Sequence, residues 1–172
     1  MNIQEFVGQS IGTWKSQRSA HHLAFGHFEA IKSLIDIAEI ALDDPALLAL
    51  CELHDTDPSL IIAPFRMTWE GETDWDDDQK VKGTCVLAPV PASVKHGKLL
   101  RDQGYAEEMP AIGEYFFTDD DTFVLNTPYD RAAAEEKIWF VGPNVRCRVS
   151  LIKTSAGSGV VTAAFSSEIR QT

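Results

Sequence analysis

Apolar and polar residues alternate with a period of two along most of this chain. Neighbouring side chains of a strand point to opposite faces, so this period predicts half-buried strands. The alternation is clearest from Arg66 to Trp75 and recurs from Arg146 to Leu151. Gly- and Asp-rich turns separate eight to ten such segments. The pattern predicts an all-β protein whose antiparallel strands run up and down and close into a barrel without exposed edges.

Two helices lie outside the strand pattern. Asn2 and Glu5 have the spacing of a capping box at the start of an N-terminal helix. Asp44 followed by Pro45 has the form of an N-cap and first helical residue, and predicts a second short helix that runs to residue 54. In the irregular stretch that follows, Lys98–Gln103 is predicted to form one helical turn.

Length and charge narrow the class of protein. The 172 residues are expected to fold as a single domain, residues 1–172. Twenty-six acidic and fifteen basic residues give a net charge of −11, which argues against a nucleic acid or an anionic membrane as partner.

No apolar run reaches membrane-spanning length. Three cysteines without metal-ligand spacing indicate reduced thiols in an intracellular protein. His21 and His22 are adjacent, so in a strand they cannot share a metal ion.

The segment from Arg146 to Leu151 carries the first candidate site. Arg146, Arg148 and Ser150 fall on one face of the predicted strand. Two guanidiniums that point the same way would form a receptor for carboxylates, because each matches that group with two parallel hydrogen bonds. The alternative is an ordinary half-buried strand with its arginines in water.

Two further faces carry candidate pocket residues. Met67, Trp69 and Trp75 share one parity, and they would form either core or the wall of a pocket for a flat conjugated ligand. The last predicted strand, Val160–Arg170, places small residues and Glu168 on one face. That face either leaves room inside the barrel or lies outside in solvent.

Gly12 and Trp14 after the first helix, with Arg170 near the end, resemble the lipocalin and fatty-acid-binding (calycin) barrels, in which the arginine packs across the tryptophan. Read together, five segments that extend over nearly the whole chain resemble the S-type phycobilin lyases, the CpcS/CpeS family. These segments are Trp14–Leu23, Met67–Gly71, Leu99–Glu107, Glu136–Arg148 and Ser167–Arg170.

The resemblance implies a ten-stranded lipocalin-like barrel that attaches a free linear tetrapyrrole to a protein. The pigment would be phycoerythrobilin or phycocyanobilin, joined by a thioether bond to the central chromophore cysteine of a phycobiliprotein subunit. The resemblance also implies a homodimer, in the cytoplasm of a cyanobacterium-like cell or in the plastid stroma. No metal, nucleotide or redox cofactor is expected. The competing interpretations are a non-catalytic carrier of a tetrapyrrole or fatty acid and a chaperone-like assembly factor.

The matching motifs carry the family's functional positions onto this chain. Two carboxylates, Glu136 and Glu168, are the predicted catalytic residues, which would hydrogen-bond the pyrrole nitrogens or protonate the chromophore. The predicted ligand-binding residues are Arg18, Met67, Trp69, Trp75, Arg146, Arg148 and Ser150. Paired arginines suit the two propionates of a bilin, and indoles suit its conjugated rings.

Overall fold

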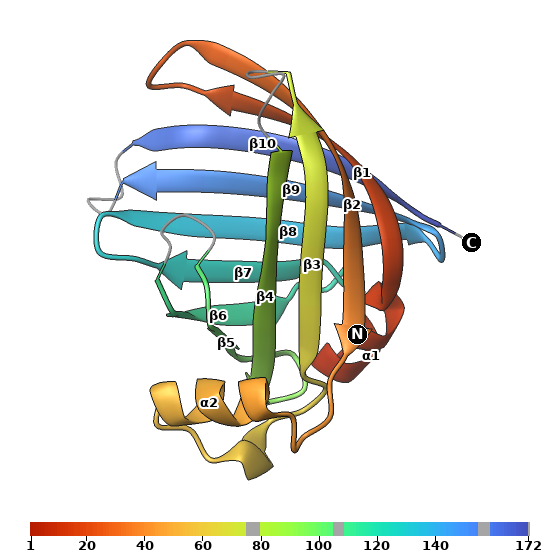
Figure 1. Cartoon of the computed structure of the whole chain (residues 1–172), viewed down its shortest axis with the longest axis vertical. Coiled ribbons are helices and arrows are strands. Elements are labelled where there is room, and N and C mark those ends of the chain that lie inside the picture. The colour runs from red at the N-terminus through yellow and green to blue at the C-terminus, as the bar shows by residue number, and fades with distance from the viewer. Residues whose placement is uncertain (75–79, 105–108, 155–158, 172) are drawn as a thin grey trace.

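Ten antiparallel strands close into one barrel in the computed structural model, which describes residues 1–74, 80–104, 109–154 and 159–171 (Figure 1). Each strand pairs with the next in sequence, and β1 pairs with β10 to close the barrel. The strands are β1 (Gly12–His22), β2 (His27–Glu39), β3 (Phe65–Thr73), β4 (Lys80–Pro91), β5 (His96–Arg101), β6 (Ala111–Phe117), β7 (Phe123–Pro128), β8 (Ala132–Gly142), β9 (Val145–Thr154) and β10 (Val160–Arg170). The predicted ten-stranded antiparallel barrel is confirmed.

The two predicted helices are confirmed together with their caps. In α1 (Ile3–Ser10), the side chains of Asn2 and Glu5 each accept a hydrogen bond of 2.9 Å from the other's backbone N–H. In α2 (Pro45–Leu53), Asp44 accepts a hydrogen bond from the N–H of Ala46. A short 3₁₀ helix, η1 (Pro58–Leu60), follows α2. In the part of the chain that the structure describes, no helix is long and apolar enough to cross a membrane.

The helical turn predicted for Lys98–Gln103 is wrong, because β5 occupies this stretch. Two adjacent leucines disguise the strand alternation. Leu99 packs inside the barrel, whereas Leu100 lies outside among the buried residues beneath α2. The helix covers the outer face of β4 and β5, so both faces of the sheet are buried there.

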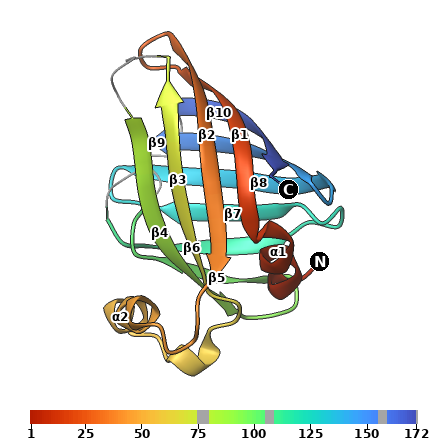
Figure 2. The same cartoon turned by 45° about the vertical axis from the view of Figure 1, so that its right-hand side comes forward.

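Helix α1 closes the barrel at the end where β1 begins, and Figure 2 shows both helices at this lower end. Its apolar face lies in the main core, where the Phe6 ring stacks on Phe123 with 4.3 Å between centroids. Trp14, at the start of β1, is fully buried. Packed side chains therefore fill this end, which we call the base.

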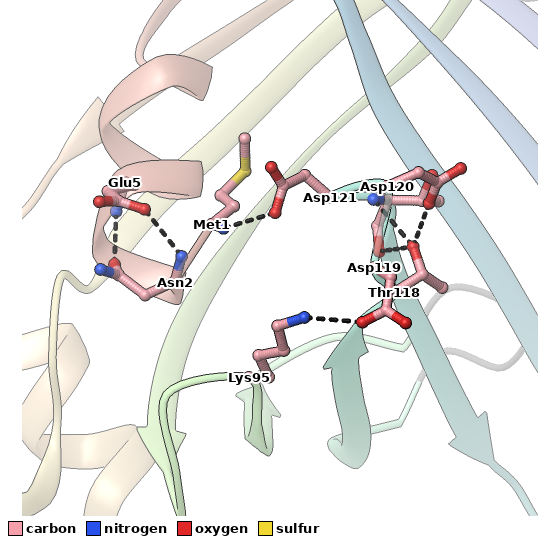
Figure 3. Close-up of polar contacts among 9 residues, drawn as sticks. Met1, Asn2, Glu5, Lys95, Thr118, Asp119, Asp120 and Asp121 are labelled. Carbon is pink, nitrogen blue, oxygen red and sulfur yellow. Dashed lines mark hydrogen bonds and ion pairs between the residues drawn. The ribbon is translucent and has the colours of Figure 1, made fainter.

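Polar contacts tie α1 to the strands at the base (Figure 3). The terminal amine of Met1 pairs with Asp121 in the turn between β6 and β7. In the same turn, Asp119 pairs with Lys95 from the turn between β4 and β5 at 3.0 Å. Exposed pairs of this kind contribute little to stability one by one. The Met1–Asp121 pair connects the residues before α1 to the β6–β7 turn, and the Lys95–Asp119 pair connects two turns of the sheet.

The predicted packing of Arg170 across Trp14 is present. The guanidinium lies 4.3 Å from the centroid of the indole and donates hydrogen bonds to the backbone carbonyls of Ile11 and Gln9 at the end of α1. Gly12 has a φ of +124°, and a Cβ there would lie 2.7 Å from Nη1 of Arg170. A glycine is therefore required where the chain leaves α1 for β1.

Replacing this arginine should loosen the base. Arg170→Ala removes a cation–π contact and leaves helix-end carbonyls without donors, so we expect it to lower the free energy of unfolding by about 1–3 kcal/mol. Urea denaturation followed by circular dichroism measures the change. The exposed Lys15 on the outer face of β1 offers a matched control, since Lys15→Ala should change stability by less than about 0.5 kcal/mol. Equal effects of both substitutions would contradict this role of Arg170.

Candidate ligand-binding pocket

A cavity of about 460 Å³ lies inside the barrel, further from the base than the main core. This volume falls within the usual range of small-molecule pockets, roughly 300–1,000 Å³. The inner faces of β1, β2, β3, β9 and β10 supply most of its lining, and β5 contributes Arg101. Among the lining residues are Arg18, Met67, Trp69, Arg101, Arg148 and Glu168.

Five charged side chains meet at the deep end of this cavity, and we call them the arginine–glutamate layer: Arg101, Glu136, Arg146, Arg148 and Glu168. Arg146 and Glu168 are directly opposite in the register of β9 and β10, and each is 1% exposed. Nε of Arg146 donates a hydrogen bond to Oε2 of Glu168. Nε of Arg148 lies 3.6 Å from Oε1 of the same carboxylate. The prediction that both arginines point into the barrel is therefore confirmed as geometry.

Glu136 extends the layer across the barrel. Its Oε1 lies 3.5 Å from Nη1 of Arg148, and its Oε2 lies 3.5 Å from Nη1 of Arg101. Arg101 stands on β5 and Glu136 on β8, so this pair spans the interior past two intervening strands. The layer thus sets three guanidiniums against two carboxylates.

The layer keeps its charges at neutral pH. Burial alone would raise the pKa of Glu168, but the guanidiniums of Arg148 and Arg146 outweigh it and hold that pKa below its ordinary value. Burial lowers the pKa of Arg146 to about 10, in spite of the Glu168 carboxylate beside it. Burial would also lower the pKa of Arg101, but the Glu136 carboxylate raises it by more. Glu168 is therefore ionised and accepts hydrogen bonds.

Two buried donors of the layer have no hydrogen-bond partner among the described residues, Nη2 of Arg146 and Nε of Arg101. Leaving a charged donor unsatisfied inside a protein is unfavourable by about 1–3 kcal/mol or more. Because Arg101 lines the cavity, a carboxylate of a bound ligand would satisfy its donor and balance the surplus positive charge.

The two predicted receptor arginines lie at different depths. Arg148 lines the large cavity. Arg146 lines only a small cavity of about 60 Å³ towards α1, which Arg148 and Arg101 also line, and its guanidinium lies 4.6 Å from the Trp14 ring. Arg146 is therefore the arginine of the layer that does not reach the large cavity, whereas Arg148 and Arg101, together with Arg18, line it.

The remaining predicted site residues divide in the same way. Met67 and Trp69 on β3 line the large cavity. Ser150 is buried on the same side of β9 as Arg148, opposite Glu136 in the register, and is not among the residues that line this cavity. Trp75 lies outside the described residues. No cluster of three or more potential metal-ligating side chains occurs in the described ranges.

The sequence analysis did not predict the roles of Arg101, which lines the cavity, and of Gly83, which lies behind the Trp69 indole. Arg101 was hidden by the supposed helical turn, although its spacing from Leu99 matches an inward-facing strand pair. Gly83 on β4 lies opposite Trp69, and a Cβ there would be 2.3 Å from Cζ2 of the indole. A glycine within a strand is a sign that another group approaches closely, and here it lets the indole lie against the wall.

Acid should weaken the fold through Glu168. Because its pKa is lowered in the folded state, this carboxyl stabilises the protein above its unfolded pKa of about 4.3, and the contribution is lost as the pH falls through the folded value. We expect Glu168→Gln to cost about 3–5 kcal/mol at pH 7, since it leaves buried arginines poorly paired. The difference in the free energy of unfolding between this variant and the wild type should shrink below pH 4. Urea unfolding across this pH range measures it, with the exposed Glu70→Gln as control; a gap that does not change with pH would refute the assignment.

Filling the space at Gly83 should close the pocket without unfolding the barrel. Gly83→Val pushes the Trp69 indole towards the cavity, so we expect binding of a flat conjugated ligand to weaken at least ~10-fold. Absorbance titration measures binding, and circular dichroism reports the fold. Thr84→Val, one residue along the same strand, is the control. Unchanged binding in the glycine variant would show that the indole does not line the bound ligand.

Comparison with known proteins agrees with this geometry. The family model described as "CpeS-like protein" matches residues 2–171. "Chromophore lyase CpcS/CpeS 3" of Trichodesmium erythraeum (strain IMS101) is 57% identical over 172 residues, 99% of each chain. "Putative phycoerythrobilin lyase CpeS" of Microchaete diplosiphon is 60% identical over 158 residues, 90% of this chain and 71% of that one.

Among solved structures, the S-type phycobiliprotein lyase CPES from Guillardia theta is similar to the whole barrel. It has a TM-score of 0.89 and 44% sequence identity, and the match covers 100% of this chain and 94% of that chain. A family match over nearly all residues, high identity to chromophore lyases and the same fold lead to one conclusion. The chain belongs to the CpeS-like family, the chromophore lyases named CpcS/CpeS.

Proposed function

We propose that this chain is a phycobilin lyase that takes up a free linear tetrapyrrole and attaches it by a thioether bond to the central chromophore cysteine of a phycobiliprotein subunit. The observation that carries the proposal is a cavity of about 460 Å³ with an indole on its wall and buried arginines at its deep end. The name of the relative from Microchaete diplosiphon favours phycoerythrobilin as the first pigment to test and phycocyanobilin as the second.

The arginines that face the pocket bind the propionates of the bilin. The Nη1 atoms of Arg148 and Arg101 each lie 3.5 Å from a carboxylate oxygen of Glu136. Their guanidiniums are therefore oriented before the ligand binds. Arg18 adds a third positive charge on the wall formed by β1. Trp69 stacks on the pyrrole rings, and Met67 fills the adjoining surface.

The carboxylates of the layer orient the pigment. An ionised Glu168 accepts hydrogen bonds, so it holds pyrrole N–H groups and does not supply a proton. Glu136 keeps Arg101 and Arg148 in place from the opposite side. The lyase then acts mainly by presenting one face of the bilin in one geometry to the incoming thiol, which is catalysis by orientation.

The nucleophile belongs to the acceptor protein. Burial raises the pKa of the Cys85 thiol in spite of the nearby Arg101, and burial also raises that of Cys51. Neither is therefore a thiolate at neutral pH. Cys147 lies on the face of β9 opposite to Arg146 and Arg148, away from the pocket. Addition of a thiol to a double bond leaves the oxidation state of the pair unchanged, so the proposed reaction uses no redox cofactor.

The proposal places the lyase where phycobiliproteins are made, in the cytoplasm of a cyanobacterium-like cell or in the plastid stroma. The homodimer implied by the family resemblance stays a prediction, which light scattering of the purified chain would test.

The decisive experiment separates a lyase from a carrier. The chain is mixed with phycoerythrobilin or phycocyanobilin, and each candidate acceptor subunit is then added. A lyase yields coloured subunit that survives denaturing electrophoresis, faster than the pigment does by itself. A carrier shifts the absorption band of the pigment but slows or merely permits its attachment, and that outcome would overturn the proposal.

Arg148 should matter for pigment capture as well as for the stability of the layer. Arg148→Ala removes a guanidinium that faces the pocket, so we expect the dissociation constant for the bilin to rise by about 10- to 100-fold, equivalent to about 1.4–2.8 kcal/mol. Absorbance titration measures it. Arg66→Ala, an arginine on β3 outside the cavity lining, is the matched control. Normal affinity of the Arg148 variant would remove its role as a carboxylate receptor.

A further inference from the structure

A histidine and a glutamate form a fixed pair at the end of the cavity furthest from the base. Nε2 of His22, the last residue of β1, lies 2.7 Å from Oε2 of Glu29 on β2. The other oxygen of this carboxylate, Oε1, accepts a hydrogen bond from the hydroxyl of Thr73 on β3. The carboxylate is thus held on both sides, and it holds the imidazole in turn. Three neighbouring strands converge on this point.

The pair stands where the pocket meets solvent. His22 lines the cavity, and its side chain is 23% exposed. The tip of the β1–β2 hairpin lies at the end of the barrel opposite to α1 (Figure 1). His22 is six positions along β1 from Ser16, which lies opposite Glu168 in the register, and this corresponds to about 20 Å along the strand. The pair is therefore far from the arginine–glutamate layer.

The chemistry of this arrangement suits a base. Burial would raise the pKa of Glu29, but its hydrogen bonds with Thr73 and His22 and the charges of His22 and Arg18 lower it overall, so the carboxylate is ionised. An ionised carboxylate accepts the Nε2–H of a neighbouring imidazole, and in the neutral form of a ring held in this way the lone pair lies on Nδ1. A carboxylate that sets the tautomer of a histidine in this way is the arrangement by which hydrolases activate a nucleophile.

We propose that His22 is the general base that takes the proton from the thiol of the acceptor cysteine, with Glu29 as its positioning residue. This inference rests on the proposed lyase function. The acceptor is a folded protein and reaches the pigment only where the pocket meets solvent, because packed side chains fill the base. The reactive carbon of the bilin therefore points towards His22, while its propionates lie deeper, at the arginines.

The step balances without a further reactant. The S–H proton moves to His22, and the sulfur forms a bond to the ethylidene carbon of ring A. The electron pair of that double bond moves to the neighbouring ring carbon, which takes up one proton. The imidazolium gives its proton back to the pigment or to water and is neutral again. The net reaction is addition of S–H across a C=C bond.

The test compares loaded wild type with three variants: His22→Ala, Glu29→Gln and His21→Ala. His21 is the matched control, because it is the next residue on β1 but lies outside the barrel against Phe28. We expect pigment capture to be unchanged in all three. Transfer to the acceptor at pH 7 should fall about 100-fold in His22→Ala and less in Glu29→Gln, and it should not change in His21→Ala. Glu29→Gln should have no further effect in the His22→Ala background.

The pH dependence of transfer separates a base from a structural residue. A thiol that is already ionised needs no base, so the gap between wild type and His22→Ala should close as the pH rises past the ordinary thiol pKa of about 8.5. Contacts place Glu29 and His27 on β2 beside His22, and the charge of Arg18 on β1 acts on Glu29. His27→Ala, measured alongside, shows whether the second imidazole contributes.

The outcomes are distinguishable. A wild type that transfers pigment no faster than free bilin reacts would refute the lyase function itself. An active wild type with a His22→Ala variant of equal rate would refute only the role of His22. A gap that stays constant from pH 7 to high pH, or that comes with lost pigment capture, would assign the pair to the shape of the hairpin and also overturn the inference.

Discussion

The buried pairing of arginines and glutamates is the interaction on which the rest of this structure depends. Removing such charges from water is expensive, and they stay ionised inside a protein only when opposite charges and hydrogen bonds surround them. Here the partners come from β5, β8, β9 and β10, so the layer forms only when the barrel closes. The same charged side chains that require the closed barrel also form the deep end of the cavity, where an anionic ligand can bind.

The layer separates two parts of the barrel interior, a packed apolar core on the side of the base and an open cavity on the other side. On the side of the base, the core is apolar and holds the strands together. It consists of the inner face of α1, Trp14 and a cluster of phenylalanines. On the other side of the layer, small residues such as Ser16 and Ser166 leave the hollow, and the Trp69 indole lies flat over Gly83 to form its wall. The packed end of the barrel thus stabilises the fold, and the other end is free to keep a cavity of this size for binding.

Local patterns predicted the local features, whereas the pairings within the arginine–glutamate layer were not predicted. A period of two placed Arg146 and Arg148 on one face of a strand, and cap residues identified both helices, because neighbours in sequence decide these features. The inward orientation of that face followed from the family resemblance and not from the period. Depth is different. That Arg146 lies on the side of the layer that faces the base, whereas Arg148 also reaches the large cavity, depends on strand tilt and register across the whole barrel. Arg101 was missed for a related reason: Leu99 and Leu100 face opposite sides, one towards the core and one towards α2.

The filled base has a kinetic consequence. Because packed side chains fill the base, pigment and acceptor would both approach the cavity from the opposite end of the barrel, and they would compete for access to it. An acceptor that docks on an empty barrel would block entry of the chromophore and form an unproductive encounter. Under the proposed function the chromophore therefore enters first and the protein docks second, and the finished adduct leaves as one piece when the two proteins separate.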